Sequence, residues 1–203
     1  AIWFATETRV TTAHDDGVGD DGPHRHVGGL DSAHVSRLPY RLDCRTYYAR
    51  LRDLPWPVWL DSGFPRSSGE RHYDVITADP FTTLTRERGL SRVTGPDGGV
   101  SATDADPLVL LRELLGDVAA PVGGLAFPGG AIGYLGYDLA RELGTLGPRD
   151  GLAGWPEMAV GVYDWAILVD HDRRRSYFVR QGRDPRPDGR WQTVLNRLRP
   201  LPS

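Results

Sequence analysis

The sequence contains a single cysteine, Cys44, among 203 residues, which excludes an internal disulfide framework. One thiol suits a reducing cytoplasm, where we expect the protein to reside. The sequence also lacks an apolar run of membrane-spanning length, the longest candidates lying near residues 165–169. Its formal net charge is −3, so it lacks the basic footprint typical of nucleic-acid binding. We therefore expect neither a membrane nor a nucleic acid among its partners.

Residues 1–35 differ in composition from the rest of the chain. They combine aspartates and glycines with His14, His24, His26 and His34, and show no helical or strand periodicity. One interpretation is a metal site with His24 and His26 at its centre. The other is a disordered leader, because such polar chain cannot bury enough surface to fold. We expect the disordered leader, followed by one folded domain over residues 36–203.

The folded part carries local signals for strands and helices. Asp43 predicts an N-cap for a helix over 44–54, and Asp106-Pro107 predicts a helix that ends at Gly116. Further patterns predict strands at 58–60, 73–78, 82–85 and 158–169, a hairpin through 171–174 to a strand at 176–179, and an amphipathic helix over 191–198.

Local motifs for chemistry are weak. Gly129, Gly130 and Gly133 lack the spacing and the following Lys-Ser/Thr of phosphate-binding loops, so they predict close strand packing instead. Ser62 lies outside a nucleophile elbow, and Cys44 has no evident base partner. His171 is expected in a surface turn. We therefore predict no catalytic residue and no metal site in this chain.

Five segments occur together in a familiar order. They are LPWPVWLDSG (54–63), YDVITADP (73–80), DPL (106–108), GGAIGYLGYD (129–138) and PEMAVGVYDW (156–165). Together they resemble the N-terminal region of aminodeoxychorismate synthase component I, a relative of anthranilate synthase component I. The resemblance runs from about residue 38 to about residue 179. It implies an α+β fold with mixed or antiparallel sheets and packed helices.

The resemblance also implies a reaction. In this family chorismate and ammonia from a glutamine amidotransferase subunit give 4-amino-4-deoxychorismate, on the path to 4-aminobenzoate and folate. The catalytic residues and the Mg²⁺ site lie in a C-terminal chorismate-binding domain, which we expect to be absent from this chain. We therefore expect a non-catalytic, structural or ligand-binding part of a larger enzyme, inactive alone.

Site residues follow from the same resemblance. Ser62, Arg71, His72 and Tyr73 match a tryptophan pocket of the family, with L-tryptophan as the candidate ligand. Asp61 stands where feedback-regulated members usually carry glutamate, so we do not expect feedback control. The family's structural motif corresponds to Gly129, Gly130, Gly133, Tyr134, Tyr137 and Asp138.

Alternatives remain open from the sequence. Ser62 can equally be a turn residue in Asp-Ser-Gly. The chain can also be a stand-alone amino-acid-binding or subunit-interaction module, or a truncated product with no function of its own. Because the chain begins with Ala1, we expect a piece of a longer protein.

Overall fold

The computed structural model describes residues 2–4, 33–63, 72–116, 125, 127, 129–142, 144, 155–187 and 189–198. Its strands are β1 (Ile2–Phe4), β2 (His34–Leu38), β3 (Val58–Leu60), β4 (Tyr73–Thr77), β5 (Thr82–Glu87), β6 (Leu90–Thr94), β7 (Val100–Thr103), β8 (Gly130–Leu135), β9 (Met158–Tyr163), β10 (Trp165–Asp170) and β11 (Arg175–Arg180). Its helices are α1 (Arg45–Ala49), α2 (Pro107–Leu115), α3 (Tyr137–Glu142) and α4 (Gly189–Leu198).

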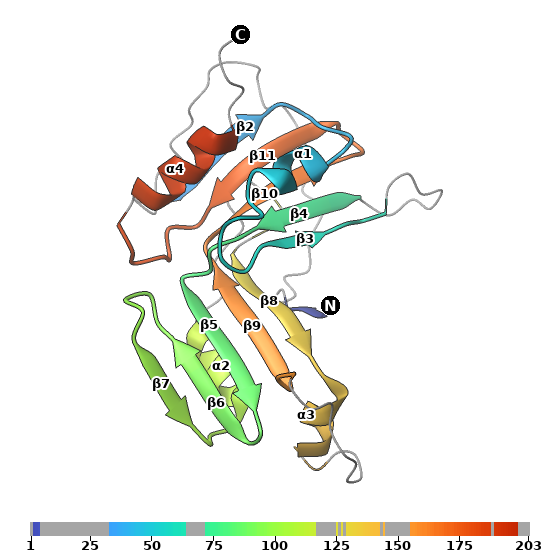
Figure 1. The fold of residues 1–203 in the computed structure, drawn as a ribbon. Coiled ribbons are helices and arrows are strands. Elements are labelled where there is room, and N and C mark those ends of the chain that lie inside the picture. Colours follow the sequence, from blue (N-terminus) through green and yellow to red (C-terminus); the bar gives the residue numbers. More distant parts are fainter. Residues whose placement is uncertain are drawn as a thin grey trace.

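The strands form two sheets. A six-stranded sheet has the order β1-β8-β9-β5-β6-β7, and a five-stranded sheet has the order β2-β11-β10-β4-β3. Every neighbouring pair in both sheets is antiparallel. Figure 1 shows the five-stranded sheet above the six-stranded one, with α1 and α4 beside the former and α2 behind the latter. The expected α+β fold is confirmed.

Two nearly continuous strands link the sheets. β4 of the five-stranded sheet leads through residues 78–81 into β5 of the six-stranded sheet. β9 of the six-stranded sheet leads through Asp164 alone into β10 of the five-stranded sheet. The strand predicted over 158–169 is therefore two strands in different sheets. The apolar pattern runs through both because both are completely buried.

The five-stranded sheet is buried on both faces. Trp165, Ile167 and Val169 of β10 pack with α1 and α4, in a cluster that includes Leu51 and Leu198. The alternate residues Ala166 and Leu168 face the other side, where they pack with Phe127 and Ile132. This two-residue alternation is the period of a strand, so both faces of β10 must be apolar. Ile132 belongs to β8, and the second cluster therefore joins the two sheets.

Local capping defines α2 as predicted. The Asp106 carboxylate accepts the backbone N–H groups of Leu108 and Val109, and Pro107 occupies the first helical position. Gly116 ends the helix with φ +57°. Leu111 of this helix packs against Leu84 of β5 in the core of the six-stranded sheet. The predicted hairpin between β10 and β11 and the predicted C-terminal helix α4 are also confirmed.

The helix predicted over 44–54 is shorter in the structure. α1 covers only Arg45–Ala49, with Cys44 at the cap position, while Asp43 accepts the Arg45 N–H at 3.0 Å. Beyond Arg50 the chain continues in tight turns, in which Leu51 and Leu54 donate to carbonyls three residues back. These turns bring Leu51 into the core, where it is fully buried.

The start of the chain also differs from the expected leader. β1 pairs with β8, and β2 begins at His34, two residues before the expected boundary at residue 36. Both strands form hydrogen bonds with partners that are distant in the sequence. Amino-acid composition does not reveal such partners. The remaining leader histidines, His14, His24 and His26, lie outside the described residues.

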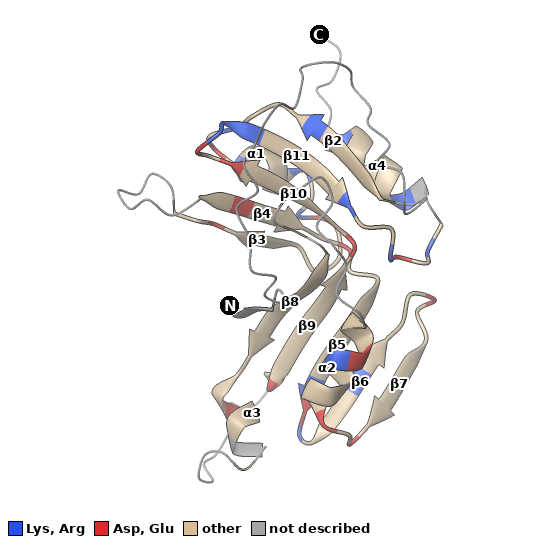
Figure 2. Ribbon diagram, turned by 180° about the vertical axis from the view of Figure 1, so that it is seen from behind, with Lys and Arg blue, Asp and Glu red and all other residues tan. Residues whose placement is uncertain are grey.

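Charge is unevenly distributed among the strands. β8 and β9 contain no charged residue, and Figure 2 shows both strands uniformly tan. Arginines instead lie in β2, β5, β6 and β11 and on the approach to α4. Among the described helices, none has the length and apolar character to cross a membrane.

Candidate ligand site at the start of β4

Three of the four tryptophan-pocket candidates lie close together at one edge of the five-stranded sheet. Ser62 follows β3, His72 precedes β4, and Tyr73 is the first residue of β4. β3 and β4 pair side by side, and Tyr73 pairs with Asp170 at the end of β10. The topology thus gathers these residues with the turn that follows β10. Arg71 lies outside the described residues.

Asp74 is the centre of this edge. Its carboxylate is buried, and its Oδ1 atom accepts both the backbone N–H and the hydroxyl of Ser62 at 2.9 Å. Its Oδ2 atom accepts the indole N–H of Trp59 at 3.0 Å. Burial alone would raise the pKa of Asp74, but the hydrogen bonds from Ser62 and Trp59 outweigh it and hold the pKa below its usual value. Asp74 is therefore an ionised carboxylate that fixes the position of Ser62.

His171 lies beneath this carboxylate, which corrects the surface position expected from the sequence. Its side chain is only 2% exposed, and its Nε2 atom lies 3.4 Å from Asp74 Oδ1. Its Nδ1 atom lies 3.1 Å from the Tyr40 hydroxyl. The first residue of a hairpin turn can face inward when a neighbouring segment covers it, and here Tyr40 of the β2–α1 connection does so. Turn composition alone could not reveal that long-range contact.

Cys44 completes the buried cluster. Its Sγ atom lies 4.0 Å from His171 Nε2, and burial strongly raises the pKa of the thiol, with Asp74 adding to the effect. Among the described residues, Cys44, Asp74 and His171 form a group whose ligand atoms lie within 4.8 Å of one another. Mg²⁺ prefers six oxygen ligands, so this set of sulfur, nitrogen and oxygen donors does not fit it. The hydrogen bonds from Ser62 already occupy Asp74 Oδ1, and the cluster is held together as a hydrogen-bonded network.

A second pair joins β4 to the same turn. Asp172 accepts the His72 backbone N–H at 3.1 Å, and its other oxygen lies 3.0 Å from His72 Nδ1. These contacts with His72 lower the pKa of the exposed Asp172 carboxylate. The His171 backbone N–H donates to the His72 carbonyl at 3.0 Å. The edge that carries Ser62 is thus anchored from the β10–β11 turn.

The titration of Asp74 predicts how stability depends on pH. The folded state lowers the pKa of this carboxylate below the unfolded value of about 3.9, so it binds the proton less tightly than the unfolded chain does. Its contribution is complete above that value and is lost as the pH falls through the folded pKa. Urea unfolding from about pH 6 down to about pH 2 should show a steeper loss of stability in the wild type than in Asp74→Asn. If stability fell equally with pH in the wild type and in Asp74→Asn, the lowered pKa of Asp74 in the folded state would be contradicted.

The glycine-rich motif forms a strand and not a loop. Gly130–Leu135 is β8, which pairs along its whole length with β9 and at residues 131–133 with β1, so this part of the motif is a strand of the sheet and not a phosphate-binding loop. A Cβ atom on Gly133 would lie 2.1 Å from the Ala159 carbonyl oxygen, while Gly129 has φ +75°. The Tyr134 hydroxyl donates to the Pro156 carbonyl at 3.2 Å.

The end of the motif lies at the surface and outside the packed strand. Tyr137 is 85% exposed at the start of α3, beside Asp138 in the first turn. The buried part of the motif is the first half of β8, residues 130–132, while Gly133–Leu135 are half-buried.

Sequence comparison identifies relatives of the chain. Aminodeoxychorismate synthase component 1 of Klebsiella aerogenes is 41% identical over 150 residues, covering 71% of this chain and 33% of that protein. The protein of the same name from Escherichia coli K12 is 34% identical over 187 residues, covering 80% of this chain and 40% of that protein. The chain thus spans between a third and two fifths of the length of these relatives. No family model matches the sequence.

A solved structure also matches. The crystal structure of anthranilate synthase component I from Streptococcus pneumoniae TIGR4 aligns with a TM-score of 0.49 and 27% identity, over 68% of this chain and 32% of that one. The family assignment rests on the sequence relatives, whose matches cover most of this chain. The chain belongs to the aminodeoxychorismate synthase component I family, within the wider group that includes anthranilate synthase component I.

Proposed function

We propose that the chain is the N-terminal, non-catalytic part of an aminodeoxychorismate synthase component I. The parent protein would convert chorismate and ammonia to 4-amino-4-deoxychorismate for 4-aminobenzoate and folate synthesis. The observation that carries this proposal is the 41% identity over 150 residues to a relative of that name. The protein would act in the cytoplasm, where its single thiol stays reduced.

The chemistry of the described residues supports a non-catalytic role. Nucleophilic catalysis needs a nucleophile with a base in reach of its proton. The Ser62 hydroxyl donates to Asp74, but the lowered pKa of that carboxylate makes it a weak base. Cys44 has His171 at 4.0 Å, but burial raises the pKa of the thiol and keeps it protonated. These groups stabilise the local fold and do not provide an activated nucleophile. The chorismate site and the Mg²⁺ that supports the reaction would belong to a C-terminal chorismate-binding domain, and the ammonia would come from a glutamine amidotransferase subunit.

The edge around Ser62 is our candidate for an amino-acid pocket. Because the Ser62 hydroxyl gives its proton to Asp74, its remaining lone pairs are acceptors for an ammonium group. The buried negative charge of Asp74 favours the same ligand group. Tyr73, the first residue of β4, would supply the aromatic ring against which an indole can pack. L-tryptophan is therefore the proposed ligand, with Arg71 and His72 as further members of the pocket.

Calorimetric titration with L-tryptophan tests the pocket. We expect binding to the protein expressed from the complete reading frame, and a loss of about tenfold or more in affinity in Ser62→Ala, since a hydrogen bond to a charged group is removed. Ser101→Ala, on the exposed strand β7, is the matched control and should bind as the wild type does. Equal affinity in both variants would show that Ser62 is only a turn residue.

An activity assay tests the parent reaction. With chorismate, Mg²⁺ and ammonia, the product of the complete reading frame should form aminodeoxychorismate, and the 203-residue chain alone should form none. Product from the short chain would contradict the non-catalytic role. Tryptophan binding without product from the complete protein would favour the stand-alone amino-acid-binding module.

A further inference from the structure

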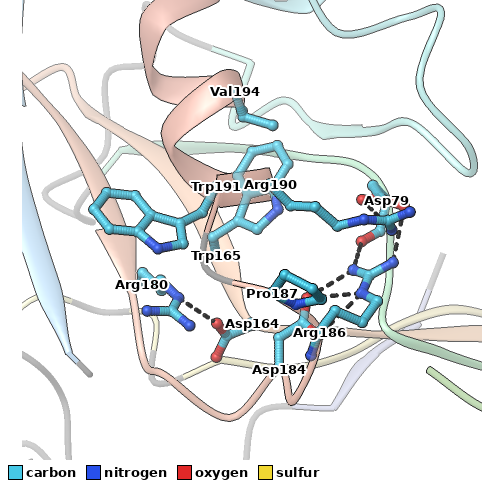
Figure 3. Close-up of a pocket in the computed structure, with 10 residues that line it drawn as sticks. All are labelled: Asp79, Asp164, Trp165, Arg180, Asp184, Arg186, Pro187, Arg190, Trp191 and Val194. Atoms are coloured by element: carbon cyan, nitrogen blue, oxygen red, sulfur yellow. Dashed lines mark hydrogen bonds and ion pairs between the residues drawn. The ribbon is translucent and has the colours of Figure 1, made fainter. Parts of the chain in front are cut away.

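The two strand crossings between the sheets each carry an aspartate. Asp79 lies in the β4–β5 crossing, where its φ is +53° and its backbone N–H donates to the Pro55 carbonyl at 2.7 Å. Asp164 is the single residue between β9 and β10, and it is 3% exposed. A non-glycine residue with positive φ directly before a proline is strained, so the surrounding contacts must hold it in place. Figure 3 shows both aspartates in the wall of one small pocket.

One segment binds both crossings. Residues 180–187, which lead from β11 to α4, are here called the arginine strap. Arg180 donates through Nε to Asp164 at 3.0 Å, and the Arg183 backbone N–H donates to the same carboxylate at 2.6 Å. Arg186 lies 3.1 Å from the Asp79 carboxylate and donates to the Asp79 carbonyl at 2.9 Å. The dashed lines in Figure 3 follow the pairs of Arg180 and Arg186.

The geometry of Arg186 is fixed by a third aspartate. Its Nε atom donates to both oxygens of Asp184 within the strap, at 2.9 Å each. The guanidinium is thus oriented before it reaches Asp79, and its side chain is only 11% exposed. Arginine provides this forked geometry and lysine does not. All 24 basic residues of the chain are arginines.

The strap also reaches an element outside the five-stranded sheet. The Arg183 side chain donates to the Leu115 carbonyl at the C-terminal end of α2, which packs on the six-stranded sheet. The strap itself begins in β11 and ends at α4, both of which belong to the five-stranded half. It therefore contacts both halves of the molecule as well as the two crossings between them.

We propose that the arginine strap is a clamp that sets the angle between the two sheets, and that the sheets hinge at residues 78–81 and at Asp164 when the strap is released. Hinges need only a few residues at the ends of elements to absorb a backbone change, and these two short crossings are such positions. This inference does not depend on the proposed function.

Distance measurements between spin labels test the clamp. One label is placed at Arg37→Cys on β2 and the other at Val100→Cys on β7, two exposed positions in different sheets, in the protein expressed from the complete reading frame. The native Cys44 is buried, and single-label samples verify that it stays unlabelled. The wild type should give one narrow distance distribution. Arg186→Ala should widen it to roughly twice the width or add a second distance, as hinge motion requires.

The matched control removes an arginine–aspartate pair away from the crossings. Arg197 of α4 lies 2.9 Å from Asp53 near α1, so both partners belong to the five-stranded half. Arg197→Ala should leave the distribution narrow. An equally narrow distribution in folded Arg186→Ala would overturn the proposal, as would equal widening in Arg197→Ala.

A milder pair of variants covers the case in which Arg186→Ala does not fold. Arg190→Ala removes a 3.4 Å contact that reaches Asp79 from an exposed position on α4. Arg186→Lys keeps the positive charge but loses the forked geometry of the guanidinium. Each should widen the distribution by less than Arg186→Ala is expected to do. Wild-type distributions in both folded variants would contradict the clamp.

Discussion

Gly133→Val is expected to cost about 4 kcal/mol or more of folding free energy, which is exceptional for one substitution. The added Cβ atom would lie 2.1 Å from the Ala159 carbonyl oxygen and 2.6 Å from the Val160 Cα atom. Both are backbone atoms of β9, the central partner of β8, so no side chain can rotate away to relieve the overlap. Chemical denaturation should show a large fall in midpoint, or the protein should not fold.

Gly98→Ala is the control for a general effect of losing a glycine. Gly98 lies in the β6–β7 turn with φ +83°, and a Cβ atom there would meet nothing within 4 Å. Only the backbone conformation then opposes the substitution, and the expected cost is about 1 kcal/mol. Similar losses in the two variants would show that Gly133 is not a close-packing position.

Asp74→Ala is expected to cost about 3–5 kcal/mol, because it removes the acceptor at the centre of a buried network. The Ser62 hydroxyl, the Trp59 indole N–H and the Ser62 backbone N–H all lose their acceptor at once. Urea unfolding at neutral pH measures the loss. The same variant should also weaken tryptophan binding, because Ser62 is no longer held in position.

Asp172→Ala is the matched control at the same edge. Asp172 also pairs with a histidine, but its side chain is 43% exposed, against 4% for Asp74. A solvated pair of this kind contributes about 1 kcal/mol or less. Equal destabilisation by the two alanine variants would contradict the central role assigned to Asp74.

The elements that the sequence predicted are those with local signals. α2 is bounded by Asp106-Pro107 and Gly116, whose capping contacts lie within a few residues, and the structure places the helix between them. The β10–β11 hairpin likewise depends on neighbouring residues. Such contacts form between residues that are close in the sequence, and for this reason the sequence predicts them.

The features that the sequence could not predict depend on distant partners. The break at Asp164 is set by which sheet each half of the run joins, and Arg180 and Arg183 stabilise it from a later strand and loop. Burial of His171 depends on Tyr40, which lies 131 residues earlier. For the candidate site, the family resemblance selected Ser62, His72 and Tyr73, but Asp74, which organises them, carried no separate signal. Its position two residues before buried Ile76 on a strand was the one available hint.

Complementation tests the proposed function most directly. The complete reading frame is expressed in a bacterial strain that grows only with added 4-aminobenzoate because it lacks aminodeoxychorismate synthase component I. Growth without 4-aminobenzoate is the predicted result, and the 203-residue chain alone should not restore it. A reading frame that leaves this requirement in place, yet relieves the tryptophan requirement of a strain lacking anthranilate synthase component I, would contradict the proposal.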